Sequence, residues 1–117
     1  CNYVCYMESG KSNNFFELDI RVGKIIKVEI FEEAIKPAYK LNIDFGENIG
    51  IKKTSAQITN YEISELYEKL CIAVLNLGNK QIGPFISECL VLGSICENGD
   101  VLLLQPSNKA KLGDKVS

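Results

Sequence analysis

The residues best suited to binding chemistry fall into two stretches of the chain. The first stretch, between residues 21 and 53, carries seven basic side chains: Arg21, Lys24, Lys27, Lys36, Lys40, Lys52 and Lys53. The second, residues 76–93, reads NLGNKQIGPFISECLVLG and separates two apolar runs by turn-forming and polar residues. A plain connector between strands needs fewer polar residues, so this loop favours a functional role. The net charge is only −2, but the distribution of charge bears more on binding than its sum.

Other residue types argue against catalysis. The chain has no histidine, which removes the commonest general base and the usual metal ligand. The five cysteines form no C-x-x-C pair, and three of them lie in apolar runs, where buried free thiols are expected: Cys71, Cys89 and Cys96. The adjacent carboxylates Glu32 and Glu33 lie in a polar linker and are interpreted as solvated surface. We therefore expect a binding protein that is not an enzyme and holds no metal or cofactor.

Length and hydropathy predict one folded domain. The 117 residues are 46% hydrophobic and 24% charged, as in ordinary globular proteins. Residues 1–14 are polar and are expected to form a flexible tail, with Met7 as a natural start, while residues 15–117 form the domain. No apolar stretch approaches the roughly 20 residues that cross a bilayer, and the N-terminus lacks the pattern of a signal peptide. We expect a cytoplasmic protein without membrane insertion.

Alternating apolar residues predict three consecutive strands. Residues 20–30 are predicted to form the first strand, with a bulge or bend just after Gly23. Its apolar residues on one common face are Ile20, Val22, Ile26, Val28 and Ile30. Residues 38–46, AYKLNIDFG, alternate again, with inward residues Tyr39, Leu41, Ile43 and Phe45. Residues 49–58 are predicted to form a third strand antiparallel to the second.

The periodicity then changes and identifies the fold class. Residues 59–62 have the spacing of a capping box, and apolar residues follow at helical spacing: Ile63, Leu66, Tyr67 and Leu70. Two more strands are predicted at 70–77 and 89–95, and residues 97–100 carry a hairpin signal before 101–106. An all-β chain with one short helix between strands 3 and 4 is typical of an OB-fold, a five-stranded Greek-key barrel, here with short N- and C-terminal extensions. A β-sandwich is the alternative.

An OB-fold also predicts where a ligand binds. The outer face of strands 2 and 3 in such barrels binds oligonucleotides or oligosaccharides. In this chain that face would carry Lys40 and Asn42 from the second strand. The third strand would add some of Lys52, Lys53, Ser55 and Gln57.

Several segments together resemble the tRNA-binding domain superfamily, which includes C-terminal modules of methionyl-tRNA synthetases. They read DIRVGKI, KPAYKLNIDFG, SAQITNY, NKQIGPFISECLVLG and GDVLLLQPSNKAKLGDKV, and the similarity covers about residues 15–117. The chain is most similar to the CsaA branch, small proteins described as export-related chaperones. The resemblance implies an OB-fold homodimer. It also implies a contribution of residues 79–90 to a tRNA site, where Lys80, Ser87 and Glu88 match the pattern but Gln81 and Gly83 replace Lys and Arg.

Two functions follow from these observations. The first is tRNA binding, in which lysines neutralise phosphates and polar groups hydrogen-bond to bases or 2′-hydroxyls. The candidate residues are Lys36, Lys40, Asn42, Lys52, Lys53, Asn76, Lys80, Gln81, Ser87 and Glu88. The second is an export-related chaperone that holds unfolded precursor polypeptides in an apolar groove lined by Phe85, Ile86 and residues across a dimer interface.

The partner expected in both cases is a second copy of the chain. The predicted dimer interface comprises Phe15, Phe16, Leu18, Phe85 and Ile86. Residues 15–18 precede the first strand and have no obvious place inside a five-stranded barrel, and unplaced apolar patches mark interfaces. The alternative is that Phe15 and Phe16 fold back and close the open end of their own barrel.

Overall fold

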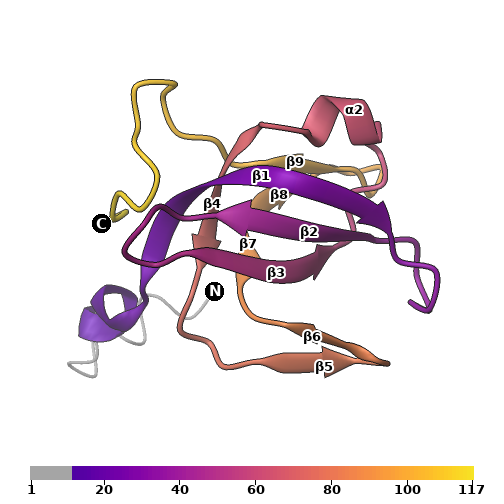
Figure 1. Ribbon diagram of the computed structural model, residues 1–117, viewed down its shortest axis with the longest axis horizontal. Helices are drawn as coiled ribbons and strands as arrows, with labels where there is room; N and C mark the ends of the chain where they lie inside the picture. The colour runs from indigo at the N-terminus through magenta and orange to yellow at the C-terminus, as the bar shows by residue number, and fades with distance from the viewer. Residues whose placement is uncertain (1–11) are drawn as a thin grey trace.

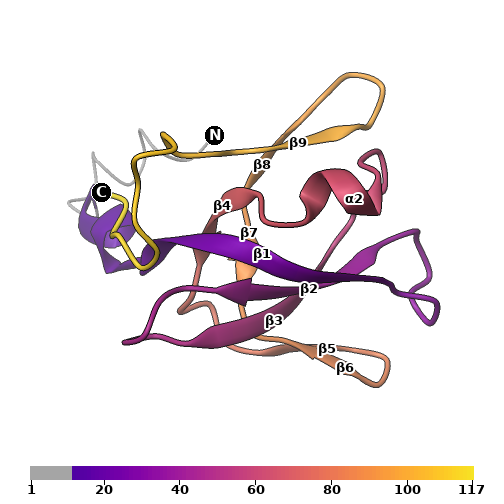
Figure 2. The ribbon, with the colours of Figure 1, turned by 45° about the horizontal axis from the view of Figure 1, so that its top comes forward.

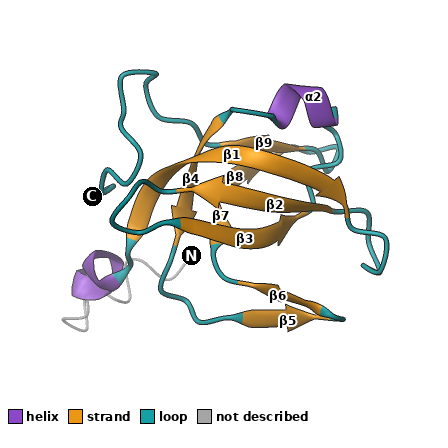
Figure 3. Cartoon of the chain, in the orientation of Figure 1, coloured by secondary structure: helices purple, strands orange, loops and turns teal. Residues whose placement is uncertain are grey.

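The computed structural model describes residues 12–117 (Figure 1). Of the tail predicted for residues 1–14, residues 1–11, which include Met7, lie outside the described part, and residues 12–14 belong to the first helical turn. The elements are η1 (Ser12–Glu17), β1 (Ile20–Ile30), β2 (Tyr39–Asp44), β3 (Ile51–Ala56), α2 (Ile63–Leu66), β4 (Leu70–Val74), β5 (Lys80–Ile82), β6 (Phe85–Ser87), β7 (Leu90–Val91), β8 (Gly93–Ile95) and β9 (Val101–Leu103). Strands dominate the described part, and α2 lies between β3 and β4 as predicted (Figure 3). None of the described helices has the length and apolar character needed to cross a bilayer.

Five antiparallel strands form a nearly closed barrel, which confirms the predicted OB-like fold. Their order is β3-β2-β1-β4-β7. The long strand β1 serves two neighbours, because Lys24 pairs with Asp44 of β2 and with Leu70 of β4. On the other side of the barrel, the backbone N–H of Glu88 donates to the carbonyl of Lys53, with an N–O distance of 2.8 Å. This bond brings the segment before β7 against β3.

The core follows the predicted alternation in β2 but not in β1. The predicted inward residues of β2 and its continuation are all buried: Tyr39, Leu41, Ile43 and Phe45. In β1 the register shifts between Ile25 and Lys27, so that Ile25 is fully buried and Ile30 is 63% exposed. The extra residue of a bulge changes which side chains face inward. A Cβ at Gly23 would lie 2.5 Å from Cγ2 of Ile43, so β1 can cross the core closely only with glycine there.

Helix α2 begins one turn later than its predicted capping box. Its N-cap is Glu62, whose backbone N–H donates to Oε1 of Glu65, with an N–O distance of 2.8 Å. The predicted cap region is held elsewhere, because the amide of Asn60 exchanges two hydrogen bonds with the backbone of Val101. The helix ends before Glu68, which has a φ of 67°. The short helix covers the barrel through Leu66, which is fully buried.

Two hairpins project from the barrel on different sides, β5–β6 and β8–β9 (Figures 1 and 2). The strand predicted over residues 89–95 divides into β7 and β8 at Leu92, whose backbone bonds both Ile72 of β4 and Leu104 after β9. The predicted turn at residues 97–100 is present, and Gly99 adopts a φ of 93° there. Such a φ is accessible to glycine without strain.

The cysteines pack as expected in two of three places. Cys71 and Cys89 are buried free thiols, whereas Cys96 is half-buried. Burial raises the pKa of the Cys71 thiol to about 12. Burial also raises the pKa of the Cys89 thiol to about 11, although the hydrogen bond with Thr54 opposes this shift. Both thiols therefore stay protonated at neutral pH.

Among the three cysteines in the described part of the chain, thiol labelling at pH 8 should modify Cys96 first and leave Cys71 and Cys89 unmodified while the barrel is folded. The thiolate is the reactive form, and both buried thiols are inaccessible and hard to ionise. Peptide mapping after timed labelling assigns the modification to each cysteine. Full labelling of Cys71 or Cys89 without denaturant, or a disulfide between them, would contradict this packing.

Candidate functional site

Three lysines and Asn42 lie on the outer face of β1, β2 and β3, and we call Lys27, Lys40 and Lys53 the basic cluster. Asn42 of β2 pairs with Lys53 of β3 and with Lys27 of β1. Lys40 of β2 pairs with Ser55 of β3. Directly opposed residues of antiparallel strands share a face, so Lys40, Asn42 and Lys53 lie together as the sequence predicted. The register of β1, which the sequence pattern did not specify, adds Lys27 and Glu29 to this face, where Glu29 pairs with Lys40 and its Oε1 atom lies 3.7 Å from Nζ of Lys27.

Two aromatic rings contact Lys40 and Lys53 of this cluster. The Nζ atom of Lys40 lies 5.1 Å from the ring centroid of Phe31 and 5.6 Å from that of Phe85. The Nζ atom of Lys53 lies 5.5 Å from the Phe85 centroid. The two rings themselves pack at 5.3 Å with an interplanar angle of 58°. These distances suit cation–π attraction, which favours one position for each of the two ammonium groups.

Lys40 also has an acidic neighbour. Its Nζ atom lies 3.8 Å from Oε1 of Glu33, in the loop between β1 and β2. The sequence interpreted Glu33 as plain solvated surface, and the contact shows that it lowers the local positive charge. The pair is partly exposed and long, so its attraction is weak.

Ser87 and Glu88 attach the β5–β6 hairpin to the barrel. The Ser87 hydroxyl lies 2.7 Å from the Thr54 hydroxyl and accepts from the N–H of Ser55 at 3.2 Å. Oε1 of Glu88 accepts from the N–H of Lys53 at 2.9 Å. Ser87 is only 8% exposed. The structure therefore gives both side chains internal partners beside the basic cluster. The sequence had predicted that they contact the ligand.

Asn76 also has an internal role, at the other end of the molecule. Its Oδ1 atom accepts from the N–H of Asp19 at 2.8 Å, and its Nδ2 atom donates to the carbonyl of Glu17 at 2.7 Å. Both polar atoms of the amide thus tie the loop after β4 to the end of η1. The structure does not bring Asn76 to the face of Lys40 and Lys53.

Lys52 lies on the opposite face of β3 from Lys53. It pairs with Ile43, a fully buried residue, so its side chain leaves the strand on the inner side. Its ammonium is close enough to lower the pKa of Cys89 slightly against the larger effect of burial. Of the predicted pair, Lys53 therefore belongs to the basic cluster and Lys52 does not.

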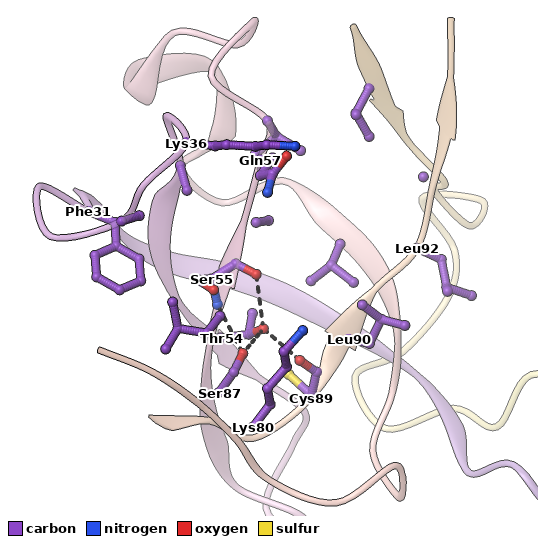
Figure 4. A pocket seen from close by; sticks show the side chains of 18 of the residues that line it. Phe31, Lys36, Thr54, Ser55, Gln57, Lys80, Ser87, Cys89, Leu90 and Leu92 are labelled. Carbon is purple, nitrogen blue, oxygen red and sulfur yellow. Dashed lines mark hydrogen bonds between the residues drawn. The ribbon is translucent and has the colours of Figure 1, made fainter. Parts of the chain in front are cut away.

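Lys36, Lys80 and Gln81 line a groove of about 920 Å³ between the β1–β2 loop, β3 and the two hairpins (Figure 4). In the close-up, Lys36 and Gln57 lie at one end, and Lys80 lies beside the bonded group of Thr54, Ser87 and Cys89. The amide of Gln81 donates to the carbonyl of Gly83 at 3.0 Å and stabilises the hairpin turn. Among the described lining residues, Lys36 and Lys80 carry the only formal charges.

The walls of this groove are mostly apolar. Four of the lining residues are strongly exposed: Ile35, Leu77, Leu90 and Ile95. Sequence reasoning missed them because each lies in an apolar run that predicts burial, or in a loop. The lining does not include Phe85 or Ile86, which the sequence had assigned to a groove.

The predicted interface residues fall into two groups far apart. Phe15, Phe16 and Leu18 lie at η1, whereas Phe85 and Ile86 lie on the β5–β6 hairpin at the other end in both views (Figures 1 and 2). Phe15 and Phe16 pack edge to face at 5.6 Å, and Phe16 is 67% exposed. Phe16 therefore does not close the open end of its own barrel.

Comparison with known proteins identifies relatives of both kinds expected from the sequence. A family model described as "Putative tRNA binding domain" matches residues 20–115. The methionine–tRNA ligase of Pyrococcus horikoshii is 36% identical over 116 residues, which cover 94% of this chain and 15% of the ligase. The chain therefore spans a small part of that curated relative.

Two solved structures cover almost the whole barrel. The crystal structure of a CsaA chaperone protein from Picrophilus torridus has a TM-score of 0.86 and 56% identity, with 90% of this chain and 96% of that chain covered. The chaperone CsaA of Bacillus anthracis strain Ames has a TM-score of 0.84 and 44% identity, with the same coverage of each chain. Both are similar in length as well as in fold.

Proposed function

Because the chain belongs to the tRNA-binding domain family and is CsaA-like within it, we propose that it binds tRNA through the outer face of β2 and β3. It acts as a cytoplasmic homodimer and catalyses no reaction of its own. The observation that carries this proposal is the pair of lysines, Lys40 and Lys53, held side by side on the Phe85 ring. Fixed cationic groups on one barrel face suit the phosphates of a single RNA strand.

Other residues have supporting roles in this site. Asn42 lies between Lys27 and Lys53 and offers an amide for bases or 2′-hydroxyls. Lys36 and Lys80 extend the positive charge toward the groove, and Gln81 retains its amide oxygen for the ligand. Ser87 and Glu88 act indirectly, by fixing the hairpin against β3.

A homodimer suits this function physically. One barrel offers a short binding track, whereas a tRNA is much longer. In a two-fold dimer the patch of Phe15, Phe16 and Leu18 would cover its mate. Two equivalent basic faces on one particle raise the avidity for a large RNA when both can engage.

The neighbouring lysines of β3 provide a matched test of the tRNA site. Lys53→Ala should weaken tRNA binding about tenfold at low salt and reduce the slope of log affinity against log salt by about 0.7–0.9, the loss of one phosphate contact. Lys52→Ala removes the same charge one residue away, on the opposite face, and should change the affinity less than about twofold. Fluorescence titration with several tRNA species measures both. Equal effects of the two substitutions would remove the β2–β3 face from the proposal.

A second candidate function is the capture of unfolded polypeptide in the groove. The exposed apolar walls favour it, since large apolar patches mark interaction sites. The solved relatives described as chaperones point the same way. Binding of this kind should be insensitive to salt or slightly strengthened by it, opposite to tRNA binding.

A further inference from the structure

Phe85 occupies an unusual place among the charged groups of the basic face. Its ring receives the ammonium groups of Lys40 and Lys53, which come from neighbouring strands, at 5.6 and 5.5 Å from the centroid. The ring also packs on Phe31, which is buried in the barrel wall. One side chain of the β5–β6 hairpin thus connects the barrel to both lysines.

Without this ring Lys53 would lose its aromatic contact, and Lys40 would keep only Phe31 and Glu33. Lys53 pairs with Asn42 and Lys40 pairs with Ser55, so the lysines are diagonal neighbours across β2 and β3. Their like charges repel each other, and each side chain has many rotamers to lose. Attraction to the electron-rich ring face offsets the repulsion and restricts both side chains before a ligand arrives.

We propose that Phe85 is a positioning residue of the tRNA site, which holds the ammonium groups of Lys40 and Lys53 side by side for neighbouring phosphates of one RNA strand. The proposal rests on the proposed function. Phe85 does not act as a stacking platform for bases, because ammonium groups lie against its ring and Phe31 packs beside it. It gives the hairpin a second function beyond that of a groove wall.

Three variants separate positioning from simple packing. Phe85→Leu keeps an apolar side chain but removes the ring, and should weaken tRNA binding about three- to tenfold, in line with two modest cation–π contacts. Phe85→Tyr keeps the ring and should restore the affinity to within about twofold. Ile63→Ala, at an exposed apolar position on α2 outside the proposed tRNA site and the predicted interface, is the control and should bind like the parent protein.

A double-mutant cycle completes the test. In a Lys40→Ala/Lys53→Ala background, Phe85→Leu should change tRNA affinity less than about twofold, because the groups that it positions are gone. An equal loss in both backgrounds, or no loss in the parent, overturns the proposal. Proton NMR gives a readout without RNA: the ε-methylene protons of Lys53, which contacts the Phe85 ring, should be shifted upfield in the parent and in Phe85→Tyr, but not in Phe85→Leu. Lys40 should keep the part of its shift that comes from the Phe31 ring. If the ring shifts are present but tRNA does not bind, the proposed function is refuted while the contact of the lysines with Phe85 stands. If the shifts are absent, the contact of the lysines with Phe85 is itself refuted.

Discussion

Simultaneous replacement of Lys40, Lys53 and Lys80 by alanine is expected to weaken tRNA binding by about two to three orders of magnitude at low salt. Each lysine that neutralises a phosphate releases a counterion, and three lost contacts should lower the slope of log affinity against log salt by about 2. Lys40 and Lys53 share the Phe85 ring, and Lys80 begins the attached hairpin. The loss should be similar for all tRNA species, since phosphate contacts do not read sequence.

The C-terminal segment offers a control with the same change in net charge. Three lysines are exposed there: Lys109, Lys111 and Lys115. The C-terminal segment lies away from the β5–β6 hairpin in Figure 1. Their triple replacement by alanine should change the affinity for tRNA only a few-fold, through long-range charge alone. Unchanged affinity in the Lys40, Lys53 and Lys80 variant would favour polypeptide capture as the function.

Replacement of Phe15 and Phe16 by serine is expected to convert the proposed homodimer into a folded monomer. Phe16 is 67% exposed in the single chain, and burying such a ring contributes about 1.5–3 kcal/mol. A two-fold interface buries the ring of each subunit, so the dimer should weaken by roughly two to four orders of magnitude. Light scattering at micromolar concentration measures the mass, and circular dichroism reports whether the barrel remains folded.

A serine at Ile63 is the control for this substitution. Ile63 is an exposed apolar residue of α2, outside the predicted interface, and its replacement should leave the mass unchanged. A parent protein that is already monomeric, or a Phe15 and Phe16 variant that unfolds as a monomer, would exclude this interface. A dimer that survives the double substitution would point instead to the apolar groove around Leu90 and Ile95.

The sequence predicted the fold well where periodicity alone determines it. The alternation of β2 and the helix after β3 follow from side-chain spacing, and both are present. The bulge lies after Ile25 and the helix starts at Glu62, both later in the chain than predicted, because tertiary contacts decide these positions. The close approach of Ile43 to Gly23 and the bonds of Asn60 to Val101 join residues that are distant along the chain.

The candidate site was predictable only in part for a similar reason. The outer-face positions of Lys40, Asn42 and Lys53 follow from strand alternation, and the structure brings them together. A shift of one residue places Lys52 on the other face, which a pair of adjacent lysines does not reveal. The ring contacts of Phe31 and Phe85 depend on how a hairpin folds over a distant strand, and no local pattern encodes that packing.

The salt dependence of binding by the unmodified chain tests the central claim most directly. The affinity for tRNA and for a denatured polypeptide should be measured at several salt concentrations under otherwise equal conditions. Phosphate neutralisation predicts that log affinity for tRNA falls linearly and steeply with log salt, with a slope of about −2 or steeper for three or more contacts. Polypeptide binding should stay level or strengthen. A flat response for tRNA, or tight polypeptide capture without measurable tRNA binding, would contradict the proposed tRNA site on β2 and β3.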